Sequence, residues 1–141
     1  MKFMLIMRST AGAKAAQKDL DFEAIINAMG AYNEAMMTAG VLVSGEGLAD
    51  DTANAFVVSF DGAGPTVSDG LYGETHELFN GYWIIEVANK AEAIEWASRC
   101  PMSPGTKLEV RRLSDMSDFE GFEDNEFIQK EEGWREELGQ S

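Results

Sequence analysis

Apolar residues recur along the chain at spacings that predict a definite order of strands and helices. A short apolar run at residues 2–7 predicts a buried strand. From Phe22 to Met36 the apolar residues recur at helical spacing, and Gly40 ends that pattern where a helix C-terminus favours glycine. The remaining pattern predicts a second helix at 90–99 and strands at 41–48, 54–60, 66–69, 81–87 and 107–113.

The order of these elements, β-α-β-β-(β)-β-α-β, predicts the fold class. Two helices that pack on one face of an antiparallel sheet are the simplest way to satisfy that order. We therefore expect a ferredoxin-like α+β fold with an added hairpin.

The strand predicted at 81–87 carries bulky apolar groups on both faces. Because side chains alternate along a strand, Trp83 and Ile85 point to one side of the sheet, and Tyr82 and Ile84 point to the other. The two helices of the chain can cover only one face of such a sheet. The pattern therefore predicts a homodimer that buries the second face.

Residues 114–141 differ from the rest of the chain in charge, and they lie outside the predicted fold unit at 1–113. They hold ten acidic and two basic side chains, together with four aromatic residues. A disordered acidic tail seldom contains so many aromatic groups. Since Phe127, Trp134 and Leu138 fall on one helical stripe, we expect the tail to pack on the body or on a partner subunit, with disorder as the alternative.

Charge and composition exclude several classes of protein. The chain has 25 acidic and 11 basic side chains and a formal net charge of −14, whereas a nucleic-acid binder needs a basic surface. No apolar run approaches the roughly 20 residues of a membrane span. The opening MKFMLIM is interpreted as a strand rather than a signal peptide, and the single Cys100 suits a reducing compartment. We therefore expect a cytoplasmic protein.

Metal and cofactor signatures are also missing from the sequence. The chain has one histidine and one cysteine, and its carboxylates show no recognised spacing for metal ligands. No phosphate loop, dinucleotide fingerprint or nucleophile elbow is present. We expect neither a metal nor an organic cofactor.

The stretch SDGLYGETHELFNGYWIIEV at 68–87 resembles the signature of the DGPF-motif branch of the YCII-related proteins. The matching positions are Asp69, Gly70, Glu74, Thr75, Glu77 and Gly81. His76 stands where lysine is usual in that signature. Other departures from it are Leu71, Tyr72 and Gly73. Residues 39–48 and 92–101 are similar to further segments of the family in the same order, so the resemblance covers 1–113.

The resemblance implies a ferredoxin-like fold that dimerises into an α+β barrel. Most members of the family have no known activity, and a shorter branch is thought to use a histidine and an aspartate in a pocket. The predicted first helix of this chain has no histidine, so that pair is not carried over. Many DGPF members are encoded beside extracytoplasmic-function sigma factors, which implies a regulatory association for some of them.

His76 is the candidate for acid–base chemistry, because an unperturbed imidazole titrates near neutrality. A carboxylate from Asp69 or Glu74 beside it would orient the ring and favour its charged form, as in a general acid–base pair. The alternative is structural. Asp69-Gly70 is favourable turn chemistry, and the lysine that related sequences place at position 76 favours an exposed loop.

Four further residues are candidates for the lining of a ligand pocket: Arg8, Tyr32, Glu46 and Trp83. Arg8 ends the first strand, where it is either a solvated strand end or an anion-binding group, and Glu46, between two glycines, is a candidate neighbour for it. Tyr32 and Trp83 belong to the apolar sides of the first helix and of the sheet, where core or interface packing is the alternative. Cys100 is interpreted as a packing residue.

Three functions remain open at this point. The first is a small-molecule-binding protein or a cofactor-free acid–base enzyme with a pocket in a dimeric barrel. The second is a regulatory protein-interaction module, associated with a sigma factor and without catalytic activity. The third is a stable domain whose role the sequence does not reveal. The fold permits the first function but does not establish it.

Overall fold

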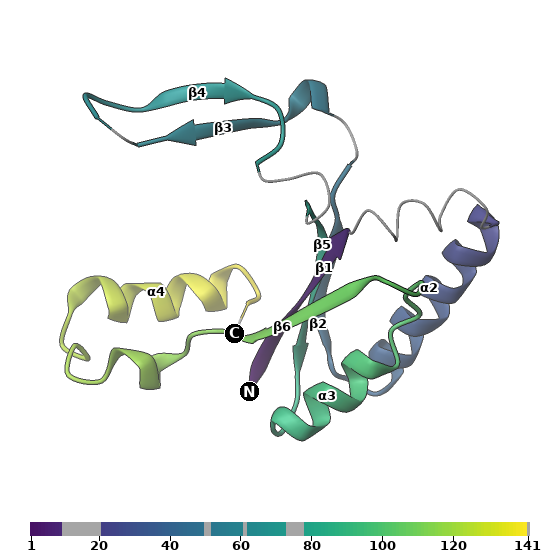
Figure 1. Cartoon of the computed structure of the whole chain (residues 1–141). Coiled ribbons are helices and arrows are strands. Elements are labelled where there is room, and N and C mark those ends of the chain that lie inside the picture. The colour runs from purple at the N-terminus through teal and green to yellow at the C-terminus, as the bar shows by residue number, and fades with distance from the viewer. Residues whose placement is uncertain (10–20, 50–51, 61, 73–77, 141) are drawn as a thin grey trace.

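The structure, a computed structural model, describes residues 1–9, 21–49, 52–60, 62–72 and 78–140. Its centre is a four-stranded antiparallel sheet in the order β2-β5-β1-β6. The strands are β1 (Lys2–Ser9), β2 (Leu42–Gly47), β5 (Leu78–Glu86) and β6 (Lys107–Arg112). Two helices, α2 (Phe22–Thr38) and α3 (Lys90–Ser98), pack on the same face of this sheet (Figure 1).

This architecture is the ferredoxin-like α+β fold that the sequence predicts. The chain order β1-α2-β2-β5-α3-β6 places β1 between β5 and β6 and makes β2 an edge strand. Several boundaries differ from the prediction by one or two residues, and the largest difference is in β5, which begins at Leu78 rather than at position 81. The extra residues pair with the end of β1 beyond a register shift between Met7 and Arg8, and a period-2 pattern does not reveal such a shift.

Side-chain caps mark where both helices begin. Asp21 accepts a hydrogen bond from the Glu23 N–H at 3.1 Å. Asn89 accepts one from the Glu92 N–H at 3.0 Å, and the Glu92 carboxylate accepts one from the Ala88 N–H at 2.8 Å. The second helix therefore begins with a capping-box-like arrangement, with its return bond shifted by one residue.

The end of α2 is set by Gly40, whose φ is +70°. The Gly40 N–H donates to the Met37 carbonyl and the Val41 N–H donates to the Met36 carbonyl, both at 3.0 Å. These two bonds form a Schellman motif, which needs a left-handed backbone that glycine adopts readily. The motif turns the chain directly into β2.

The hydrophobic core lies between the sheet and the two helices. Three of its side chains, Leu5, Met36 and Ile85, are completely buried. The rest of the core cluster comprises Phe3, Tyr32, Val41, Trp83, Val87, Ala93 and Trp96. Burial of one large apolar side chain stabilises a fold by about 1.5–3 kcal/mol. The central strands β1 and β5 and both helices contribute to this cluster, and partly buried Leu42, Leu108 and Val110 from the two edge strands pack against it, so it is the main source of stability.

A separate two-stranded sheet is inserted between β2 and β5. It consists of β3 (Phe56–Ser59) and β4 (Thr66–Asp69), joined as an antiparallel hairpin. The hairpin projects away from α2 and α3 (Figure 1) and makes the added hairpin of the prediction. Four of its large apolar side chains are exposed, namely Phe56, Val58, Phe60 and Val67, whereas Val57 is half-buried.

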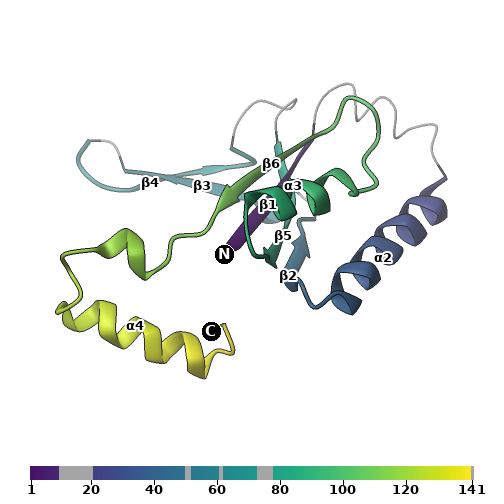
Figure 2. The same cartoon turned by 90° about the horizontal axis from the view of Figure 1, so that it is seen from below.

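The C-terminal segment contains a short 3-10 helix, η2 (Met116–Phe119), and the helix α4 (Glu126–Glu137). Figures 1 and 2 both show this segment on the side of the sheet that is far from α2. Its end returns to the start of the chain, where Lys2 Nζ donates to the Gln140 carbonyl at 3.0 Å. The described tail therefore contains two helical stretches and is attached to the body at both of its ends.

The sequence predicts the wrong face of the tail helix for contact with the body of its own chain. Phe127, Trp134 and Leu138 are all exposed. The face that meets the body instead carries Ile128 and Arg135, which line a cavity there. Helical periodicity defines a stripe, but the rotation of the helix depends on how η2 and Gln140 attach it. Packing of the aromatic stripe on a partner subunit stays a prediction.

Candidate functional site

The face of the sheet opposite α2 and α3, called here the open face, has an apolar centre. In one row across the sheet, Tyr82 of β5 lies opposite Ile6 of β1, and in the next row Ile84 lies opposite Met4. Ile6 is buried among its neighbours, whereas Met4, Tyr82 and Ile84 are half-buried. The Phe79 ring lies 6.4 Å from the Tyr82 ring between centroids. The apolar centre therefore spans β1 and β5, whereas the sequence analysis identified only the apolar residues of the strand at 81–87.

Charged groups border the apolar centre. Glu46 on β2 and Glu109 on β6 end the row that contains Tyr82 and Ile6. Arg8 Nη2 lies 3.7 Å from Glu109 Oε2, and both side chains remain more than one-third exposed. Water screens an ion pair of this exposure, so it adds little to stability. Both charges remain accessible to a polar ligand or to a second protein surface.

Arg8 and Glu46, which the sequence analysis offers as candidate neighbours, lie on strands that are not adjacent in the sheet. Arg8 on β1 is opposite Phe79, and Glu46 on β2 is opposite Tyr82, with β5 between the two strands. The glycine before Glu46 has a packing role. A Cβ atom at Gly45 would lie 2.9 Å from the Trp83 ring, so glycine leaves room for the indole on the helical face.

Tyr32 and Trp83 lie in the core, on the side opposite the open face. Their rings meet edge to face, with centroids 5.7 Å apart. The Tyr32 hydroxyl donates to the Trp96 carbonyl at 2.9 Å, and Trp83 Nε1 donates to Asn33 Oδ1 at 2.9 Å. Burial raises the pKa of Tyr32 well above its usual range, so its hydroxyl stays protonated near neutrality. These contacts favour the packing alternative for both residues.

The catalytic candidates lie at and beyond the end of the hairpin. Asp69 ends β4, where it is exposed and opposite Phe56. Gly70 follows with φ +107°, and its N–H donates to the Ala55 carbonyl at 2.8 Å. Gly70 thus has the positive φ that the turn interpretation expects. The other two catalytic candidates, His76 and Glu74, lie outside the described residues, as do Thr75 and Glu77, and catalysis by this loop stays a prediction.

Cys100 is half-buried beside the core. Burial raises the pKa of its thiol to about 11, which leaves the nucleophilic thiolate almost unpopulated near neutrality. Over the described part of the chain, His, Cys, Asp and Glu side chains nowhere gather in threes as metal ligands do. Within that same part, every helix is too short or too polar to cross a membrane.

The sequence analysis missed several residues of the open face that only strand pairing brings together. These are Met4, Ile6, Phe79, Glu109 and Arg111. Alternation in KFMLIMR and KLEVRR was available as a signal. It identifies which residues of a strand share a face, but not which strands are neighbours, and that order comes from the topology.

Comparison with known proteins gives one match to a family. A family model described as the YCII-related domain matches residues 1–117. No curated protein matches the chain.

Proposed function

Because the chain belongs to the YCII-related domain family, we propose that it is a small-molecule-binding protein that works as a homodimer. The ligand pocket in this proposal lies between the open faces of two subunits. The observation that carries the proposal is the apolar centre of the open face, formed by Met4, Ile6, Tyr82 and Ile84 with charged groups at its border. Helices α2 and α3 lie on the other face of the sheet, and the described tail reaches the open face at its Lys2 and Glu86 end.

Burial of the open face is the physical reason for the dimer. A sheet with apolar groups on both faces is stable when a second layer covers each of them. A second copy that is related by a twofold axis would meet this surface with the same residues, as in other isologous interfaces. Two such faces enclose an apolar space, which suits a small ligand.

The border of the open face determines what such a ligand would contact. Arg8 would bind an anionic or carbonyl group, while Glu46 and Glu109 would accept hydrogen bonds. If the bound molecule reacts, the chain offers acid–base chemistry through His76 with Asp69 or Glu74, without a cofactor. Binding is the core of the proposal, and catalysis is an addition to it.

Sedimentation velocity tests the dimer on which the pocket depends. The wild-type chain should sediment as a dimer at micromolar concentration, and Ile84→Lys should shift it to the monomer by burying a charge in the interface. Ile94→Lys is the matched control, because Ile94 is exposed on α3, away from the open face. It should leave the dimer intact. A stable monomer of the wild-type chain would overturn the proposal.

A thermal-shift screen of small molecules then tests binding itself. A ligand that binds the folded protein raises the melting temperature by mass action. The shift should disappear in Ile84→Lys, which removes the pocket, and should persist in Ile94→Lys. His76→Lys separates binding from catalysis, because it should abolish turnover if His76 is the acid or base. Full turnover in that variant would refute the catalytic addition and leave the binding proposal in place.

The alternative is a regulatory protein-interaction module, and two exposed surfaces favour it. The hairpin exposes Phe56 and Val67, and the acidic tail exposes Phe127 and Trp134. If a sigma factor is the partner, titration of the full chain with that purified factor should give saturable binding. A chain truncated after Leu113 should bind more weakly. Equal binding by both chains would exclude the tail from the interaction.

A further inference from the structure

A cavity of about 460 Å³ lies between the tail and the end of the sheet that carries the N-terminus. We call it the tail cavity. The start of β1 and the end of β5 form one wall, and η2 and α4 form the other. Its volume is within the range of roughly 300–1,000 Å³ that small-molecule sites occupy. It lies at the margin of the sheet, away from Tyr82 and Ile6.

The interior of the tail cavity is apolar. Its apolar lining residues come from the start of β1, the segment after β6, η2 and α4, and they are Met1, Leu113, Met116, Phe119 and Ile128. Met116 and Phe119 are still 44% and 41% exposed although α4 lies over them. The tail therefore does not close on its own body, and apolar surface remains for a ligand to cover.

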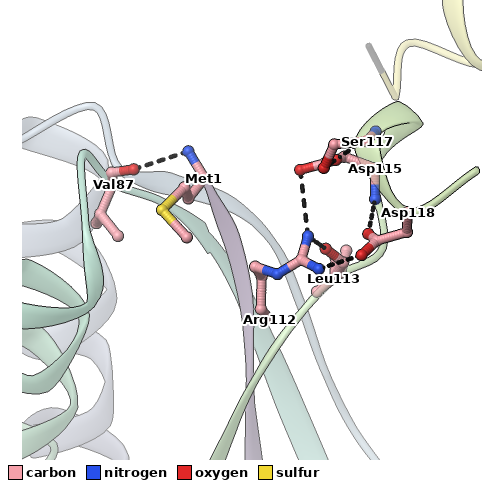
Figure 3. Close-up of polar contacts among 7 residues, drawn as sticks. All are labelled: Met1, Val87, Arg112, Leu113, Asp115, Ser117 and Asp118. Carbon is pink, nitrogen blue, oxygen red and sulfur yellow. Dashed lines mark hydrogen bonds and ion pairs between the residues drawn. The ribbon is translucent and has the colours of Figure 1, made fainter. Parts of the chain in front are cut away.

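The basic groups at the tail cavity already have partners. The N-terminal ammonium of Met1 donates to the Val87 carbonyl at 2.9 Å (Figure 3). Lys2 Nζ donates to the Gln140 carbonyl, as described above. Arg135 Nη2 donates to Glu131 Oε1 at 2.9 Å. An incoming anion would have to compete with all three contacts.

The acidic groups at the tail cavity are more numerous than the basic ones. Asp115 pairs with Arg112 (Figure 3) and Glu131 pairs with Arg135. Three further lining carboxylates, those of Glu86, Glu132 and Glu136, have no basic partner within the described ranges. The local field therefore favours a positive charge above an apolar interior.

We propose that the tail cavity binds an organic amine with an apolar body. The body of the ligand lies against Met116, Phe119 and Ile128. Its ammonium group donates to the carboxylates of Glu132 and Glu136, which form charge-assisted hydrogen bonds. All residues of the site come from one chain, from the tail and from the Lys2 and Glu86 end of the open face.

Three probes of the same shape test the charge requirement. These are 4-phenylbutylamine, 4-phenylbutanol and 4-phenylbutyrate, which differ only in the terminal group. Titration calorimetry on the full chain should give the amine about tenfold tighter binding than the carboxylate, with the alcohol between them. Equal affinities, or tighter binding of the carboxylate, would overturn the proposal.

Methionine methyl resonances test the location of the site. The chain has eight methionines, of which Met1 and Met116 line the tail cavity. With the amine bound, the methyl signals of these two residues should shift, and those of Met36 in the core should not. A bound amine that leaves Met1 and Met116 unchanged would place the ligand elsewhere and refute the proposal.

A matched pair of variants tests the carboxylates. The double substitution Glu132→Gln and Glu136→Gln should weaken the amine about tenfold and leave the alcohol unchanged. Glu137→Gln is the control, since it removes one charge from the same helix at a residue outside the cavity lining. It should change neither affinity. If the control weakens the amine as much as the double variant does, the attraction comes from net charge and the site is refuted.

Discussion

Helices α2 and α4 begin in the same way but differ in burial. Each begins with a side-chain cap, in which Asp21 accepts from the Glu23 N–H and Asn125 accepts from the Phe127 N–H. Helix α2 then buries Tyr32 and Met36, whereas α4 has no buried residue. A cap therefore determines where a helix starts, but burial determines what the helix contributes to stability.

The two sheets differ in the same way. β5 alternates between buried and half-buried residues because α2 and α3 cover one of its faces. Every residue of β4 is exposed, and β3 is exposed at alternate positions. An isolated two-stranded hairpin is marginally stable in water. The stable unit is therefore the four-stranded sheet with its two helices, while the hairpin and the tail depend on what covers them.

The largest expected effect separates β5 from the hairpin. Ile85→Ala removes a completely buried side chain and should lower the free energy of unfolding by about 2–5 kcal/mol. Val67→Ala on the exposed hairpin should change it by less than about 0.5 kcal/mol. Urea unfolding followed by circular dichroism measures both values.

The contrast between β5 and the hairpin fails if Val67→Ala lowers the free energy of unfolding as much as Ile85→Ala does. Such a result would mean that another surface buries the hairpin in solution. A second copy of the chain is the first candidate for that surface. Repeating the measurement on Ile84→Lys would then decide the matter, because a monomer should no longer respond to Val67→Ala.

The next effect concerns two glycines that face each other on β2 and β5. A Cβ atom at Gly81 would lie 2.8 Å from the Glu46 carbonyl oxygen, whereas a Cβ atom at Gly47 would meet no atom within 4 Å. Gly81→Ala should therefore force the edge strand away and cost about 1–3 kcal/mol, a typical cost of overpacking. Gly47→Ala should cost far less. Equal costs, measured by thermal unfolding, would show that β2 is not held closely to β5.

The sequence predicted most of the fold because the signals that define it are local. The apolar spacing of α2, the capping residue Asn89 and the turn glycine Gly40 each act within a few positions. Their agreement with one another identified the ferredoxin-like fold. The start of β5 at Leu78 was not predicted, because pairing with the end of β1 determines it.

The candidate site was less predictable because it depends on contacts between distant segments. Helical spacing placed Tyr32 on the apolar side of its helix, but only the fold shows its hydroxyl bonded to the Trp96 carbonyl. Strand order separates Arg8 from Glu46, and no local pattern reveals that order. The rotation of α4 is likewise set by its attachments, so the stripe through Trp134 does not meet the body of its own chain, and its contact with a partner subunit stays a prediction.

A smaller and local effect is expected within the hairpin. Gly70 has φ +107°, a backbone conformation that costs a β-branched residue about 1–3 kcal/mol. Gly70→Val should therefore open the hairpin, and hydrogen exchange of the β3 and β4 amides should become faster. Ser68→Val is the control, because valine suits an ordinary strand position. Faster exchange in β5 as well would show that the hairpin and the body unfold as one unit.

The smallest effect concerns the junction between body and tail, drawn in Figure 3. Arg112 donates to the Leu113 carbonyl at 3.1 Å and pairs with both Asp115 and Asp118. The hydrogen bond from Arg112 is the largest cause of the lowered pKa of Asp118, whereas the bond from the Ser117 side chain is the largest cause for Asp115. The two carboxylates lie close together, yet a different group is the main cause of the lowered pKa of each.

Because both pKa values are lowered on folding, the contribution of this junction is present above the unfolded value of about 3.9 and is lost as the pH falls through the folded values. The tail should therefore loosen only in acid, with little change in the melting temperature near neutrality. Carboxyl carbon shifts in a pH titration can separate the two causes. Arg112→Gln should raise mainly the midpoint of Asp118, and Ser117→Ala should raise mainly that of Asp115. If Arg112→Gln moves both midpoints equally, Arg112 alone organises the junction, and the link between body and tail is a single ion-pair network.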